Sequence, residues 1–166
     1  MDMDVAAALS SQAGLAGVQW LLGDSPALEA LCAALVSLLA PGISLGKVTL
    51  QRAKYKPGRY MQAYYAAELH GPQGNSTRLV EVNWLPPGKP DPRGAAEGIP
   101  AMQAEIVERG LAAPFSSLAF DDPAWGLWAQ VSPLDAEYPQ LARLSDPAYV
   151  YALLAADPAV RSDAAA

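Results

Sequence analysis

Basic residues gather in one short stretch of this sequence. Five of the eleven basic residues fall within thirteen positions, in a chain whose net charge is −6: Lys47, Arg52, Lys54, Lys56 and Arg59. Alternate residues of a β-strand point to the same face, so the middle three would form a row of cations. Such a row has the charge to bind a phosphate, and tyrosines at 55, 60, 64 and 65 could stack a base. Charged residues on an exposed strand also keep a sheet edge soluble, so both interpretations stay open.

Residues suited to acid–base, nucleophilic or metal chemistry are few and scattered. The lone histidine, His70, precedes Gly-Pro-Gln, which indicates a turn residue. Asp121-Asp122 before a proline has the composition of an exposed turn. One cysteine, Cys32, with one histidine excludes an internal disulfide and a Cys/His zinc site. Two Ser-Ser pairs have no histidine base nearby in sequence. We therefore expect no catalytic residue and no metal site in this chain.

Three glutamates remain as candidates for a less familiar site. Glu81, Glu105 and Glu108 would act as an acid and base pair only if they converged in space with perturbed protonation. Spacing along the chain does not decide that convergence.

The segments that would position these residues show the hydrophobic periodicity of helices in some places and of strands in others. An apolar stripe after Ser25-Pro26 predicts a helix over 26–40, ended by Pro41-Gly42. Residues 47–56 and 60–69 read as a hairpin turned by Pro57-Gly58-Arg59, and 78–85 as a third strand after the turn 70–77. Alternation places Met61, Ala63, Tyr65, Ala67 and Leu69 on one face of the second strand, opposite Tyr60, Gln62, Tyr64 and Glu68.

The remainder predicts a loop and further short elements. Residues 86–94 hold four prolines and two glycines and read as a mobile surface loop. A helix over 100–109 with Gly110 as its stop, strands over 117–120 and 126–131, and a helix from Asp146-Pro147 to about 155 follow. The fold class is therefore α+β, an antiparallel sheet of three to five strands with packed helices. We expect a partly helical segment over 1–22, with helix over 5–11, one domain over 23–156 and a frayed tail over 157–166.

Composition narrows the partners and the compartment. At 166 residues, 52% hydrophobic and 17% charged, the chain suits one domain or one lobe of a larger protein. No uninterrupted apolar run reaches the length of a bilayer span, and the Met-Asp-Met-Asp start lacks a signal peptide's positive charge, so we expect a cytoplasmic protein without a membrane. A pI near 4.6 argues against nucleic acid as a partner.

The run KVTLQRAKYKPGRYMQAYYAAEL resembles the opening hairpin of the aminoglycoside-phosphotransferase-like family, whose N-terminal lobe forms a roof over ATP. WAQVSPLDAEYPQLARLSD is similar to the segment before the second lobe in some bacterial members, so the resemblance covers roughly 43–150. It implies a kinase-like N-lobe with the helix over 100–109 in the place of the family's helix C. The implied cofactor-binding set is Arg52, Lys54, Lys56, Gly58, Arg59, Glu81 and Glu105.

The chain departs from the family at the residues that carry catalysis. The phosphate-holding lysine of the third strand corresponds to Glu81, a reversed charge that would repel a nucleotide and could not pair with Glu105, its implied helix partner. Arg52, Lys54 or Lys56 would have to substitute for that lysine or neutralise Glu81. The catalytic and metal-binding aspartates of the second lobe have no counterpart. The resemblance therefore implies a degenerate module, with ATP and magnesium bound only when a partner lobe is supplied.

Two functions stay open. The first is an N-lobe-like module that is not catalytic alone, binds a nucleotide or regulates, and acts with another polypeptide or a missing C-terminal lobe. The second is a small acidic chaperone-like or regulatory protein that holds a partner polypeptide through its sheet or its apolar helix and has no nucleotide role. Homo-oligomer formation is compatible with either function.

Overall fold

The computed structural model describes residues 3–23, 25–86, 88 and 98–156. Its centre is one five-stranded antiparallel sheet, ordered β1-β2-β3-β5-β4. The strands are β1 (Ser44–Lys56), β2 (Tyr60–Gly71), β3 (Gly74–Trp84), β4 (Ala119–Asp122) and β5 (Leu127–Val131). This confirms the predicted α+β class, and the first three strands form the predicted meander.

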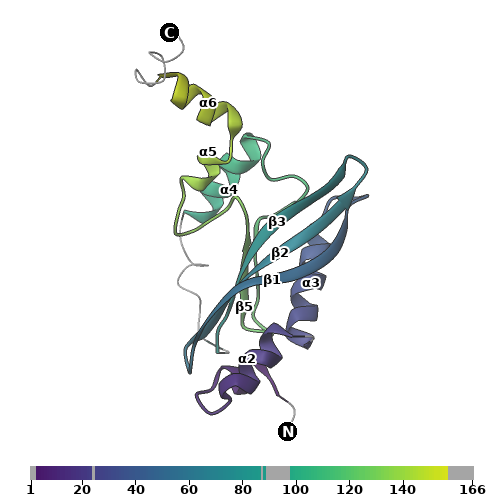
Figure 1. The fold of residues 1–166 in the computed structure, drawn as a ribbon, viewed down its shortest axis with the longest axis vertical. Helices are drawn as coiled ribbons and strands as arrows, with labels where there is room; N and C mark the ends of the chain where they lie inside the picture. The colour runs from purple at the N-terminus through teal and green to yellow at the C-terminus, as the bar shows by residue number, and fades with distance from the viewer. Residues whose placement is uncertain (1–2, 24, 87, 89–97, 157–166) are drawn as a thin grey trace.

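Helices precede the sheet in the chain, separate β3 from β4 and follow β5. They are α1 (Val5–Leu9), α2 (Gly14–Leu22), α3 (Pro26–Leu38), α4 (Ile99–Glu108), α5 (Leu141–Leu144) and α6 (Pro147–Ala156). In Figure 1, α2 and α3 lie at the lower right of the sheet and α4 and α5 at its upper left. The last helix, α6, projects away from the body of the molecule (Figure 1).

The predicted helix ends follow local chemistry. The Ser25 hydroxyl accepts a hydrogen bond from the Leu28 amide (3.3 Å) ahead of Pro26, as an N-cap should. Gly110 ends α4 at φ 72°, where its amide donates to the Val107 carbonyl and the Leu111 amide to the Ile106 carbonyl. The predicted bounds of α3, α4 and α6 are right to within two residues.

Three predictions need correction. Instead of one short helix over 5–11, the first segment forms α1 and α2, which approach so closely that a Cβ on Gly17 would lie 2.1 Å from the Ala8 carbonyl oxygen. The turn predicted over 70–77 is only Pro72-Gln73, because Gly71 already pairs with Gly74. The short helix α5 was not predicted. The mobility predicted for 86–94 and the fraying predicted for 157–166 lie largely or wholly outside the described residues.

The hydrophobic core lies on one face of the sheet. The predicted inward row of β2, Met61 to Leu69, is fully buried, as are Val80, Val82 and Trp84 of β3 and Leu31 and Leu35 of α3. Tyr65 and Trp84 meet edge to face at 6.3 Å between ring centroids. Among the described residues, the Tyr65 hydroxyl and the Trp84 indole nitrogen are buried without a hydrogen-bond partner. Burial, together with the nearby Cys32, raises the pKa of Tyr65 well above its usual range.

One stretch of the described chain, Gly14–Leu38, is long and apolar enough to cross a membrane. It comprises two separate helices, α2 and α3, and its Leu21, Leu31 and Leu35 are fully buried in the core. A core helix of this composition passes the same test, so the stretch is weak evidence for a membrane.

Candidate functional site

The face of the sheet opposite the core carries two rows of polar side chains. Directly paired residues of an antiparallel sheet point to the same face. The register therefore aligns one row across four strands, Arg52, Tyr64, Glu81 and Gln130, and a second row of Lys54, Gln62, Asn83 and Trp128. A third pair, Lys56 and Tyr60, continues the pattern. We call these ten residues the polar face.

Glu81 lies at the centre of the polar face, where it is only 6% exposed. The Gln62 side-chain amide donates to its Oε1 atom (2.6 Å) and the Gln130 amide to its Oε2 atom (2.7 Å). The Asn83 amide donates to Oε1 at 3.3 Å. All three donors are themselves at most 4% exposed. These donors stabilise the buried carboxylate of Glu81.

The cations of the polar face lie along its edge, because β1 is the outermost strand. Arg52, Lys54 and Lys56 are exposed. The Arg52 guanidinium lies over the Tyr64 ring at 5.1 Å from the centroid, and the Lys56 ammonium over the Tyr60 ring at 5.4 Å. Cation–π contacts of this kind restrict the side chains without neutralising their charge. We call Arg52, Lys54 and Lys56 the basic edge.

The turn after the basic edge is tied to the N-terminal segment. Gly58 adopts φ 67°, a conformation suited to glycine, and its amide donates to the Leu9 carbonyl at 2.7 Å. The Tyr55 hydroxyl donates to the Ser10 carbonyl at 3.0 Å. In this arrangement the Gly58 amide is already bonded within the protein. Arg59, the next residue, is exposed beside the basic edge.

A small cavity opens where α5 approaches the polar face. It has a volume of about 110 Å³, and its lining includes Tyr64, Glu81, Gln130 and, from the segment after β5, Leu134 and Leu141. Ligand pockets usually hold roughly 300–1,000 Å³. This cavity is therefore too small for a nucleotide.

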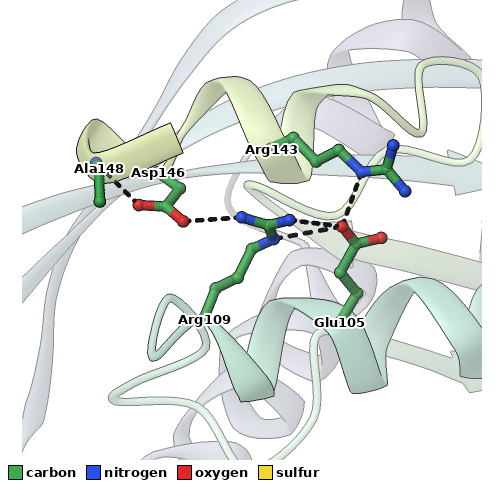
Figure 2. A network of polar contacts seen from close by, with 5 residues as sticks. All are labelled: Glu105, Arg109, Arg143, Asp146 and Ala148. Carbon is green, nitrogen blue, oxygen red and sulfur yellow. Dashed lines mark hydrogen bonds and ion pairs between the residues drawn. The ribbon is translucent and has the colours of Figure 1, made fainter. Parts of the chain in front are cut away.

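Glu105 lies apart from the other predicted site residues. Figure 2 shows its carboxylate bound by Arg143 (2.8 Å) and by Arg109 (3.0 Å), while Arg109 also reaches Asp146 at 2.7 Å. The Arg109 guanidinium stacks over Tyr149 at 5.4 Å from the ring centroid. These residues join α4 to α5 and to the start of α6, and we call Glu105, Arg109, Arg143 and Asp146 the clamp. The carboxylate of Glu105 therefore engages α5 rather than β3, and Glu108 is exposed.

The structure thus brings together part of the predicted set. Arg52, Lys54, Lys56 and Glu81 share one face of the sheet, and Gly58 and Arg59 follow in the adjoining turn. Arg52 and Glu81 belong to the same row but are separated by Tyr64 of the intervening strand. Among the described residues, no three His, Cys, Asp or Glu side chains gather as a metal site would require. Asp122 accepts the Ala124 amide at 3.0 Å, an ordinary turn contact.

Sequence reasoning missed two groups of residues. Gln62, Asn83 and Gln130 surround Glu81, and the only signal for them was that polar residues alternate with apolar ones in strands that are otherwise buried. Arg78 donates to the carbonyls of Leu111 (3.1 Å), Ala113 (2.5 Å) and Ser132 (3.3 Å), which ties the segment after α4 to β3. Burial lowers the pKa of Arg78 from its usual value.

No protein-family model, curated protein sequence or solved structure matches this chain. The likeness of residues 43–150 to a kinase-like N-lobe therefore stays a hypothesis.

Proposed function

We propose that this chain is a binding module for a phosphate-bearing anion, such as a nucleotide, which it holds at the basic edge, and that it is not catalytic alone. The observation that carries the proposal is the row of three exposed cations on one strand face, two of them stacked on tyrosines. A chain of net charge −6 concentrates positive charge here.

The stacking contacts support binding in a second way. Long basic side chains lose about 2 kcal/mol of rotamer entropy when a ligand fixes them. Tyr64 and Tyr60 already restrict Arg52 and Lys56, so part of that cost falls on folding rather than on binding. The guanidinium of Arg52 can also bind two phosphate oxygens at once.

The geometry also supports the need for a partner. The basic edge is open to solvent, and the neighbouring cavity of about 110 Å³ holds no more than a small group. A nucleotide bound at this edge would remain largely hydrated, so we expect weak affinity. A second polypeptide closing over the polar face would complete the site.

Isothermal titration tests the proposal with two probes, Mg-ATP and sodium tripolyphosphate, at low salt. We expect both to bind, because the phosphates carry the recognition. Replacing both Arg52 and Lys54 by alanine should weaken binding at least fivefold. The control, Lys47→Ala, removes an exposed cation from the same strand, roughly 17 Å before Arg52 at the rise of a strand. No binding by the wild-type chain, or equal losses in the control, would overturn the proposal.

A second candidate function is the binding of another protein chain. It is favoured by α6, an exposed helix with no buried residue.

A further inference from the structure

The helix α6 exposes its apolar side chains to solvent. Its ten residues, PAYVYALLAA, include no charged side chain and none that is buried. Tyr151 is 77% exposed, Leu153 54% and Leu154 52%, and Leu144 of α5 is 51% exposed beside them. Isolated helices shorter than about 12–15 residues are marginal in water. A helix of this kind gains its stability by packing its apolar side chains against something else.

An apolar groove lies between the end of α4 and the segment that follows α3. It has a volume of about 570 Å³, and its lining includes Leu39 after α3, Val107 of α4, and Ala112, Pro114 and Phe115. None of its lining residues is charged. Phe115 and Ala112 are buried, while Val107 is 56% exposed at the rim.

The groove is a fixed feature of the fold. The Ser116 amide donates to the Leu38 carbonyl (2.8 Å) and the Ala40 amide to the Pro114 carbonyl (2.9 Å), which joins the end of α3 to the segment after α4. Arg78 binds the carbonyls of Leu111 and Ala113 from the other side. These hydrogen bonds fix the two sides of the groove relative to each other.

The chemistry of the groove identifies what can fill it. Residues 89–97 and 157–166 carry charged side chains, for example Lys89, Asp91, Asp157 and Arg161, which suit an uncharged groove poorly. The α6 helix is apolar throughout, but in its own chain it projects away from the body (Figure 1). The helix and the groove thus match in polarity.

We propose that two copies of this chain form a dimer in which α6 of each copy occupies the apolar groove of the other. Both contacts then form around one two-fold axis, the commonest symmetry of homodimers. The clamp favours this arrangement because Arg109, which holds the base of α6, lies between Val107 and Gly110 of the groove wall. We call α6 the arm. Because it begins beside the groove of its own chain, it has only a short distance to cross to the groove of a second copy. Neither surface carries a charged side chain, so the contact buries no charge.

Specific, stable interfaces usually bury about 1,600 Å² in all, so each of the two arms and each of the two grooves would have to bury roughly 400 Å². The dimer is independent of the proposed function, because the basic edge is not part of either surface.

Sedimentation equilibrium over a wide range of protein concentration tests the dimer with three variants. We expect the wild-type chain to dimerise, and the arm variant Leu153→Glu/Leu154→Glu and the groove variant Val107→Glu each to dissociate at least tenfold more readily. All three positions are more than half exposed, so these variants should fold, which circular dichroism checks. The control is Val36→Glu on α3, which is 54% exposed and lies outside both surfaces.

A mixing experiment separates arm-in-groove exchange from packing of arm against arm. The arm variant retains an intact groove and the groove variant an intact arm, so one complete contact forms in their heterodimer. With each variant carrying a different fluorophore, we expect the mixture to associate more tightly than either variant alone. A wild-type chain that stays monomeric at several hundred micromolar overturns the proposal, as does a Val107→Glu variant that dimerises like the wild type.

Discussion

Glu81 shows how a carboxylate is accommodated on a buried sheet face. Three amide side chains from β2, β3 and β5 donate to its two oxygens. Hydrogen bonds to a charged group contribute about 1.5–3 kcal/mol, and buried donors left without an acceptor cost about 1–3 kcal/mol. The same carboxylate would repel a phosphate, so we expect the proposed ligand at the basic edge and not over the centre of the sheet.

Replacing Glu81 by alanine should destabilise the fold strongly. The change removes the acceptor shared by Gln62, Asn83 and Gln130 and leaves three buried amides to find new partners. We expect a loss of about 2–4 kcal/mol in the free energy of unfolding, measured by urea denaturation. Glu68→Ala on the exposed end of β2 is the matched control and should change it by less than about 0.5 kcal/mol. A loss below about 1 kcal/mol for Glu81→Ala would contradict this role.

For single residues, the sequence predicted the strand face on which a side chain lies but not the side chains from other strands that lie beside it. Alternation placed Gln62 and Tyr64 on the face of β2 opposite its core row, and the structure confirms it. It did not predict that Gln62 and Gln130 would flank Glu81, because that depends on the register of three strands and on the position of β5 beside β3. Long-range pairing of this kind leaves no trace in local periodicity.

The clamp joins α4 to α5 and to the start of α6. Hydrogen bonds from Arg143 and then Arg109 lower the pKa of Glu105, and a hydrogen bond from Arg109 lowers the pKa of Asp146. A carboxyl group with a lowered pKa in the folded state stabilises that state above its unfolded pKa of about 4. Its contribution is lost as the pH falls through the folded-state pKa. The clamp should therefore hold at neutral pH and open in acid.

Opening of the clamp should be visible in the backbone of residues 141–149. We expect their heteronuclear NOE values to fall when the pH is lowered from 7 to 3, and also at pH 7 in the variant Arg109→Ala, which loses contacts to Glu105, Asp146 and Tyr149 together. Arg143→Ala loses only its contact to Glu105 and should have a smaller effect. Unchanged values at pH 7 in Arg109→Ala, with the sheet still folded, would show that the clamp does not position α5.

Element order was predictable where local signals were strong. Caps, stop glycines and alternation located α3, α4, α6 and all five strands. The helices α2 and α5 escaped prediction for different reasons. The first contains Gly14 and Gly17, which weaken a helical pattern but permit close contact with α1. The second spans only four residues and is held from outside by Arg143 and Glu105.

The proposed binding surfaces lie at separate places on the molecule. The basic edge belongs to the outermost strand of the sheet, while α6 follows α5 and the apolar groove lies between α4 and the segment after α3. A dimer formed through the arms would leave both basic edges open to solvent. Each copy would then offer its own site for a phosphate-bearing ligand and for any polypeptide that completes it.

For the whole molecule, composition alone narrowed the classes of partner. It argued against nucleic-acid and metal partners. Alternation predicted the row of cations on β1, but its place beside the polar residues of β2 required the register of the two strands. The apolar groove was not predicted at all, since its walls come from the segment after α3, from α4 and from the segment that follows α4.

Amide chemical-shift mapping tests the central claim most directly. A titration of the ¹⁵N-labelled chain with Mg-ADP should shift the amides of Arg52, Lys54 and Lys56 on β1 and of Tyr60 and Tyr64 on β2, in proportion to ligand bound. The amide of Lys47, on the same strand but outside the polar face, should stay unchanged. Saturable shifts confined to the basic edge and its two tyrosines are the predicted result. Shifts spread over all basic residues alike, or none at the basic edge, would contradict the assignment of this site.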